Sequence, residues 1–237
     1  MPTSKDRARI SVIIPTYNES SGIGAMLGFL SPLIGRCEII FVDGGSSDDT
    51  IKRIESFRIW DRPPVFISPK KGRANQMNYG ASLAAGEILW FLHADSIPPV
   101  AALPQILKVM DSGYKIGCFP MRFNSRHPLM LLTAMLSNMR VRIRKIAFGD
   151  QGIFIRKDFF DELGGYAAIP LMEDYRLSIA VKKAGIPIGM ASGYIRTSER
   201  RYVNNGRLKT IWRMWMLQLR FRRGDDIEEI ARAYEDN

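Results

Sequence analysis

Cysteine is scarce in this chain, which has 237 residues and only two cysteines, Cys37 and Cys118. Each lies in or beside an apolar run, where a buried free thiol is the usual state. We therefore expect no disulfide framework and a reducing compartment. No run of about 18 apolar residues occurs, so we expect no segment that spans a bilayer. Residues 1–9 lack the apolar centre of a signal peptide. Together these absences predict a cytoplasmic protein.

Acidic residues are outnumbered, with 24 Asp and Glu against 34 Lys and Arg, and the formal net charge is +10. Such an excess indicates an anionic partner, which could be a nucleic acid, a phosphorylated ligand or an anionic membrane surface. The chain has no zinc-finger spacing and no helix-turn-helix or RNA-binding signature, so we expect no nucleic acid partner.

Apolar residues make up 46% of the chain, enough for a core. Without a repeat or an obvious linker, residues 1–237 are expected to form one domain.

Apolar runs alternate with segments of helical spacing in the first hundred residues. Strands are predicted at 10–14, 38–42, 65–67 and 88–92, and helices at about 23–34, 50–58 and 74–85. This alternation predicts a mostly parallel, doubly wound α/β sheet. The second half is less regular. Helices are expected at 99–110, 127–148, 157–163, 173–184 and 207–223, and strands at 116–123, 152–155, 186–190 and 194–197. Pro120 predicts that the 116–123 strand lies at a sheet edge.

Three of the predicted strands end in polar residues that could bind a ligand. The first ends in Pro15–Ser20, the second in Asp43–Thr50, and the fourth in His93–Ser96. In open α/β sheets, ligands bind beyond the carboxyl ends of the strands. A carboxylate there, such as Asp95, can hold a divalent cation that in turn holds a diphosphate. The alternative is a set of turns and helix caps.

Six segments, taken together, resemble family 2 glycosyltransferases of the GT-A fold: 12–19, 42–50, 72–78, 91–95, 149–151 and 172–174. The set also resembles a bacterial subgroup associated with radical-SAM and arsenosugar or selenium-related gene clusters. The resemblance implies a mostly parallel twisted sheet flanked by helices. It also implies an inverting, metal-dependent transfer from a nucleotide-diphosphate sugar, with a UDP-sugar favoured. Residues 1–98 would then be the nucleotide-sugar-binding half and 99–206 the acceptor and catalytic half.

The resemblance assigns the donor contacts to several loops. Near the nucleoside and its ribose it would place Pro15, Tyr17, Glu19 and Asp43. From their loops and chemistry we expect Lys70 and Arg73 near the phosphates, where a guanidinium group suits phosphate oxygens. Arg200 or Arg201 could be the cation that stabilises the departing nucleotide. The alternative is that these residues form turns and solvated basic loops.

His93-Ala94-Asp95 occupies the position of the family's Asp-X-Asp motif, with His in place of the first Asp. Asp95 matches the carboxylate that usually contacts the metal. We expect Mn²⁺ or Mg²⁺ on Asp95 and the donor diphosphate. His93 could be a further ligand, a ribose contact, or a hydrogen-bonded residue at the strand end.

Glu173-Asp174 resembles the family's Glu-Asp pair, which implies Asp174 as the base and Glu173 as a neighbour that positions the acceptor or the helix. The alternative is an acidic pair that favours the helix dipole. Asp150 and Gln151 are expected to line the acceptor side or to approach the donor sugar, with a tight turn before a strand as their alternative. The acceptor itself is open and could be a small molecule or a lipid-linked one.

The C-terminal segment, residues 207–237, combines an apolar stripe with basic residues. It could contact the inner face of the membrane peripherally, or pack on the domain or on a second subunit. Two other functions remain open from the sequence. A nucleotidyltransferase acting on a sugar phosphate would carry a Gly-rich loop after the first strand, and residues 15–19 are not one. A non-catalytic nucleotide- or membrane-binding module would not need the Glu173-Asp174 pair.

Overall fold

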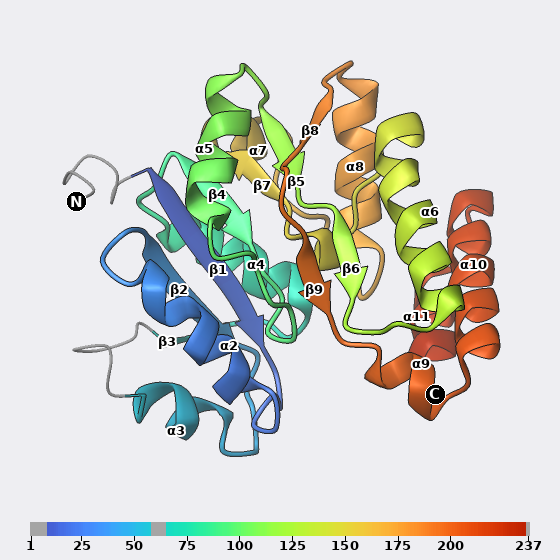
Figure 1. The fold of residues 1–237 in the computed structure, drawn as a ribbon, viewed down its shortest axis with the longest axis horizontal. Coiled ribbons are helices and arrows are strands. Elements are labelled where there is room, and N and C mark those ends of the chain that lie inside the picture. The colour runs from blue at the N-terminus through green and yellow to red at the C-terminus, as the bar shows by residue number, and fades with distance from the viewer. Residues whose placement is uncertain (1–8, 58–64, 236–237) are drawn as a thin grey trace.

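The computed structural model describes residues 9–57 and 65–235, so the start of the chain and the expected end of the 50–58 helix at Arg58 lie outside it. A seven-stranded sheet runs in the order β3-β2-β1-β4-β7-β5-β8 (Figure 1). Its strands are β1 (Ile10–Thr16), β2 (Glu38–Asp43), β3 (Val65–Ile67), β4 (Ile88–Phe91), β5 (Ile116–Cys118), β7 (Phe154–Arg156) and β8 (Ile188–Met190).

The direction of the strands brings the predicted ligand-binding loops to one edge of the sheet. Strands β1 to β4 are mutually parallel, while β7 runs antiparallel to both β4 and β5. Thr16 lies opposite Asp43 in the β1–β2 register, so the carboxyl ends of these two strands are level. The mostly parallel α/β sheet predicted from the sequence is confirmed.

The expected single strand over 116–123 is wrong. The segment forms two strands, β5 and β6 (Met121–Phe123), and β6 pairs with β9 (Ile195–Thr197) in a separate two-stranded sheet. Pro120 stands between them, and because proline has no N–H it interrupts the ladder where the chain changes sheets. Strand β5 is therefore not at an edge, since it lies between β7 and β8.

Helices cover both faces of the sheet (Figure 1). One layer contains α2 (Ile23–Leu30), the 3-10 helix η1 (Ser31–Leu33), α3 (Thr50–Glu55) and α5 (Ala102–Asp111), and the other contains α4 (Arg73–Leu83), α7 (Lys157–Glu162) and α8 (Glu173–Lys183). Because side chains alternate along a strand, Val12 packs with the first layer and Ile13 with the second. Gly80 lets α4 approach the sheet closely, since a Cβ there would lie 2.5 Å from Ile13.

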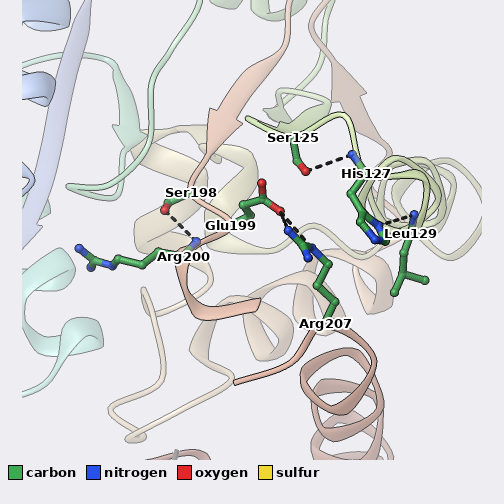
Figure 2. A network of polar contacts seen from close by, with 7 residues as sticks. All are labelled: Ser125, His127, Leu129, Ser198, Glu199, Arg200 and Arg207. Carbon is green, nitrogen blue, oxygen red and sulfur yellow. Dashed lines mark hydrogen bonds and ion pairs between the residues drawn. The ribbon is translucent and has the colours of Figure 1, made fainter. Parts of the chain in front are cut away.

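A third group of helices lies beyond β8 and β6. It comprises α6 (Pro128–Arg144), α9 (Arg200–Asn204), α10 (Arg207–Arg223) and α11 (Ile227–Glu235), and the 3-10 helix η2 (Gly149–Gln151) leads from α6 to β7. His127 caps α6, its Nδ1 accepting from the backbone N–H of Leu129 at 3.2 Å (Figure 2). Buried Leu217, Ile230 and Tyr175 join α10 and α11 to α8. The predicted helix over 207–223 is confirmed. Within the described residues, no helix is long and apolar enough to cross a membrane.

Candidate active site

Asp43 organises the loop that follows β2. Its side chain has no exposed surface, and its Oδ1 accepts from the backbone N–H groups of Gly45 and Ser46 at 2.8 and 2.7 Å. Its Oδ2 accepts from the hydroxyls of Thr16 and Ser46 at 3.0 and 2.6 Å. The carboxylate thus fixes the ends of β1 and β2 against each other, whatever contact it makes with a nucleotide.

The loops after β1 and β2 are joined side by side. The Asn18 backbone N–H donates to Ser46 Oγ at 2.9 Å, and the Ser47 N–H donates to Asn18 Oδ1 at 2.9 Å. The Glu19 N–H donates to Thr50 Oγ1 at 2.8 Å. Asn18 has a φ of 53°, a left-handed conformation that asparagine tolerates better than most residues. The two loops therefore form one wall, on which Tyr17 is exposed while Pro15 is buried within β1.

Gln76 supports this wall, and the sequence reasoning gave it no role. Its side-chain amide donates to the carbonyls of Thr16 at 2.7 Å and Val42 at 2.8 Å. These two residues lie at the carboxyl ends of β1 and β2. The only sequence signal was a polar residue among the apolar positions by which α4 faces the sheet.

His93 and Asp95, at the end of β4, differ sharply in their surroundings. Asp95 is exposed, whereas the Nε2 of His93 is buried and makes no hydrogen bond within the described residues. This nitrogen faces Gly149, where a Cβ would lie 2.4 Å away. Burial, and then the positive charge of Arg73, lower the pKa of His93 to about 3, so the imidazole is neutral.

Glu173 and Asp174 open α8 and are both buried. Asp174 Oδ2 accepts from the Gly149 N–H at 2.7 Å, and Oδ1 accepts from the Tyr175 N–H at 2.6 Å. Burial and the neighbouring Glu173 raise the pKa of Asp174 to about 6, although Arg73 and the two backbone bonds oppose the rise. The carboxylate is thus held in one orientation and is more basic than an ordinary aspartate.

Arg73 connects the predicted donor loop to this pair. Its Nε donates to Glu173 Oε1 at 2.5 Å, while its side chain stays 36% exposed. Burial alone would lower the pKa of Arg73, but Glu173 and Asp174 outweigh it and raise the pKa, so the guanidinium is always charged. One end of α4 is in this way brought to the start of α8, which lies 100 residues further along the chain.

Asp150 lies in η2 with its Oδ1 buried and without a hydrogen bond among the described residues. Burial raises its pKa, Arg140 lowers it and Asp95 raises it further. Asp95 also raises the pKa of Glu19. The charge of Asp95 therefore acts on a residue of the β1 loop and on a residue of η2. Gln151 is fully buried, and its Oε1 accepts from Arg140 at 3.2 Å. Gln151 therefore holds Arg140 and does not itself line an open surface.

The remaining predicted cations separate into two groups. Arg200 is exposed and lowers the pKa of Glu19, although burial, the largest influence on Glu19, raises it. Figure 2 shows the Arg200 side chain extended away from the ion pair of Glu199 and Arg207. Lys70 is exposed in the loop after β3. Arg201 instead contacts α11, where it donates to the Tyr234 carbonyl at 2.8 Å and lies over the Tyr234 ring at 3.7 Å.

The part of the chain that the structure describes contains no group of three or more His, Cys, Asp or Glu side chains that could hold a metal ion by themselves. What it gathers at one end of the sheet is a paired loop wall, an exposed carboxylate on Asp95, a fixed cation on Arg73 and a basic carboxylate on Asp174. This combination suits a charged ligand and a proton transfer.

Comparison with known proteins agrees with this arrangement. Residues 11–169 match the model of the family "Glycosyl transferase family 2". The undecaprenyl-phosphate 4-deoxy-4-formamido-L-arabinose transferase of Klebsiella pneumoniae is 26% identical over 157 residues, which are 62% of this chain and 48% of that protein. The chain thus spans about half the length of the curated relatives it matches.

Two solved structures share the fold. Staphylococcus aureus TarS 1-349 superposes with a TM-score of 0.65 at 18% identity, covering 81% of this chain and 60% of that 1-349 chain. The Pyrobaculum calidifontis mannosyltransferase PcManGT, in complex with GDP-Man and Mn²⁺, gives 0.61 at 20% identity, covering 80% of this chain and 56% of that one. Since the family model covers most of the chain, the protein belongs to glycosyl transferase family 2.

Proposed function

We propose that this protein transfers a sugar from a nucleotide-diphosphate sugar, with a UDP-sugar favoured, and inverts the anomeric centre. The observation that carries the proposal is Asp174, which is buried, anchored by two backbone N–H groups and raised in pKa to about 6. It stands beside the Arg73–Glu173 ion pair, at the site that the strand-end loops form. Structures of TarS with UDP-GlcNAc and with UDP, at 18 and 19% identity, share the fold and are compatible with such a donor.

In the proposed reaction, an acceptor oxygen attacks the anomeric carbon from the face opposite the nucleotide. Asp174 takes the proton of that oxygen, the new glycosidic bond forms, and the bond to the diphosphate breaks with its electron pair going to the nucleotide. We assign to Arg73, Lys70 and Arg200 the role of stabilising the charge on the departing diphosphate, supported by the fixed guanidinium of Arg73 and the exposure of the other two. Glu173 positions Arg73 through their short ion pair.

The carboxylates at the end of β4 and in η2 fit a divalent cation only in part. Asp95 offers an exposed carboxylate and Asp150 has a buried oxygen without a hydrogen bond in the described chain, and both are the oxygen ligands that Mg²⁺ and Mn²⁺ accept. We propose that Asp95 holds the cation, with diphosphate oxygens of the donor and water as the other ligands. When bound, the cation would neutralise charge on the leaving nucleotide.

For the acceptor, we propose a lipid-linked molecule whose attacking oxygen carries a proton, and a cytoplasmic enzyme with peripheral membrane contact. The names of the relatives support the lipid part of this choice, because those proteins are undecaprenyl-phosphate sugar transferases. A small-molecule acceptor is the alternative that the sequence left open.

The proposed function is tested by incubating the protein with UDP- and GDP-sugars and Mn²⁺ or Mg²⁺, and measuring the released nucleotide. We expect release of the nucleoside diphosphate from one donor, and its loss in Asp174→Asn. The matched control is Asp161→Asn, an exposed aspartate on α7, which should keep the wild-type rate. Binding without turnover would instead indicate a binding module, and release of a sugar phosphate a nucleotidyltransferase.

A further inference from the structure

The helices α6 and α10 carry an unusual number of exposed apolar side chains. They lie side by side at the end of the molecule away from β3 (Figure 1). Ile143 is 70% exposed and Trp215 is 69% exposed. We call the following nine exposed side chains the α6–α10 face: Leu131, Leu132, Met135, Leu136, Met139, Ile143, Leu208, Trp212 and Trp215. Isolated apolar side chains are normal on a surface, but a contiguous group of this kind marks an interaction site.

A groove runs inward from this face toward the site. It has a volume of about 470 Å³, and its outer walls are Leu136 and Ile143 of α6 and Trp215 of α10. Its inner lining includes Arg140 and Asp150. The groove therefore connects the apolar face with the residues next to the proposed catalytic carboxylates.

The charge of the two helices shows what can cover the face. Neither α6 nor α10 contains an acidic residue. Their basic residues are Arg140, Arg142, Arg144, Arg207, Lys209, Arg213, Arg220, Arg222 and Arg223. Two copies of this face would bring like charges together, which disfavours a self-association through it. Arg207 and Arg220 form ion pairs with acidic residues outside these helices, and Arg140 donates to Gln151. The exposed cations are Arg142, Arg144, Lys209, Arg222 and Arg223. An anionic lipid surface satisfies both these cations and the apolar side chains, and tryptophan is enriched at such interfaces.

We propose that the α6–α10 face docks on an anionic bilayer, so that the groove opens to the lipid phase between α6 and α10 and leads inward to Asp150. The role of this docking rests on the proposed function. A lipid-linked acceptor would then reach the site without leaving the membrane. This docking extends the membrane contact expected of the C-terminal segment to α6, which supplies six of the nine side chains of the face.

The test is co-sedimentation of the protein with vesicles of phosphatidylcholine alone or mixed with phosphatidylglycerol. Wild-type protein should bind the anionic vesicles and bind less at high salt. Replacing the apolar groove mouth, in Leu136→Ser/Ile143→Ser/Trp215→Ser, should lower binding by at least about tenfold. Its matched control replaces three exposed apolar side chains elsewhere, Phe29, Leu83 and Val100, by Ser and should bind as wild type does.

A second pair of variants separates local charge from net charge. Arg142→Gln/Arg144→Gln/Lys209→Gln should weaken binding to anionic vesicles by roughly a hundredfold, since each basic residue near such a surface contributes about fivefold and the three factors multiply. Arg36→Gln/Lys108→Gln/Lys183→Gln loses the same charge from exposed positions elsewhere and should bind almost normally. Thermal unfolding of each variant shows whether it is folded.

The inference is overturned if wild-type protein does not sediment with anionic vesicles, or if the test and control variants lose binding equally. It is also overturned if the wild type is a dimer in solution and the apolar variant is a monomer, because a second copy would then cover the face. Vesicle binding needs no sugar donor, so nucleotide release without vesicle binding would leave the proposed function intact. Vesicle binding without nucleotide release would support this inference and contradict the proposed function.

Discussion

Asp174 and His93 both lie next to Gly149, yet burial shifts their pKa values in opposite directions. Gly149 donates its N–H to Asp174, and a Cβ on Gly149 would lie 2.4 Å from His93 Nε2. Burial raises the pKa of Asp174 to about 6 and lowers the pKa of His93 to about 3. Near pH 7 the aspartate is thus mostly an ionised base, and the histidine is a neutral ring that cannot compete for the proton.

From this we predict the pH dependence of transfer. Asp174 must be ionised to accept a proton, so the rate should rise as the pH increases through about 6 and then level off. Asp174→Asn should lower the rate by about 10²- to 10⁴-fold and remove this rising limb. His93, with its pKa of about 3, cannot produce a limb near pH 6. The measurement is the initial rate of nucleotide release between about pH 5 and pH 8, and a limb that survived in Asp174→Asn would assign the base to another residue.

Gly149 itself gives a second prediction at this scale. In Gly149→Ala, the new Cβ would lie 2.4 Å from His93 Nε2 and 3.3 Å from Asp174 Oδ2, so the histidine must move and the bond to Asp174 must change. We expect a loss of about 1–3 kcal/mol of stability from this overpacking, together with a lower transfer rate.

The control for Gly149→Ala is Gly28→Ala on α2, where nothing lies within 4 Å of the new Cβ. It should stabilise the protein by about 0.4–1 kcal/mol, because alanine favours the helix. Thermal unfolding and nucleotide release measure both variants. Equal behaviour of the two would mean that Gly149 is not a packing constraint on the site.

Among the elements, α4 contributes two residues to the site, one turn apart at its start. Arg73 at its first turn reaches Glu173, and Gln76 one turn later holds the ends of β1 and β2. We predict that Gln76→Leu removes two buried hydrogen bonds, those to the carbonyls of Thr16 and Val42, and costs about 1–3 kcal/mol of stability. Affinity for the nucleotide should fall as well, because the loops after β1 and β2 lose their common support.

The comparison variant for Gln76→Leu is Ser82→Ala, which removes an exposed hydrogen bond on the same helix. It should change stability by no more than about 0.5 kcal/mol. Chemical denaturation and nucleotide titration measure the two effects. If Gln76→Leu unfolded like wild type, the contacts of Gln76 with Thr16 and Val42 would contribute nothing net.

How far the sequence predicted these elements depends on the range of the interactions. Strands β1, β2 and β4 are local apolar runs, and their polar ends were found as residues 15–20, 43–50 and 93–96. The break at Pro120 was read as a strand edge, because sequence alone does not show that the chain changes sheets there. The contact of Arg201 with Tyr234 of α11 could not be anticipated, since it joins two helices through a tertiary contact.

The candidate site shows the same limit. Asp95, Arg73 and Asp174 were predicted as site residues from motifs, but the Arg73–Glu173 pair spans 100 residues and came only from the fold. Their roles, and the division of the chain into 1–98, 99–206 and 207–237, stay predictions. His93 was weighed as a metal ligand, whereas the structure turns its Nε2 toward Gly149, a neighbour that spacing in the sequence does not reveal.

For the molecule as a whole, the two halves of the chain meet at the site. The β1 and β2 loops come from the N-terminal part, while η2 and α8 come from the C-terminal part. The basic α6–α10 face adjoins the second group. A ligand that bridges the two groups of loops should therefore stabilise the whole fold and not one loop only, because it binds the native state alone.

Ligand-linked stability gives the last prediction. UDP with Mn²⁺, at about a hundred times its dissociation constant, should stabilise the protein by about 2.7 kcal/mol and raise its Tm by roughly 5–10 °C. Asp95→Ala should lose the part of this rise that depends on Mn²⁺, because its exposed carboxylate is the proposed protein ligand of the cation. Asp161→Ala, an exposed aspartate on α7, is the matched control and should keep the full rise. An Mn²⁺-dependent rise of wild-type size in Asp95→Ala would move the cation to other residues, Asp150 first among them.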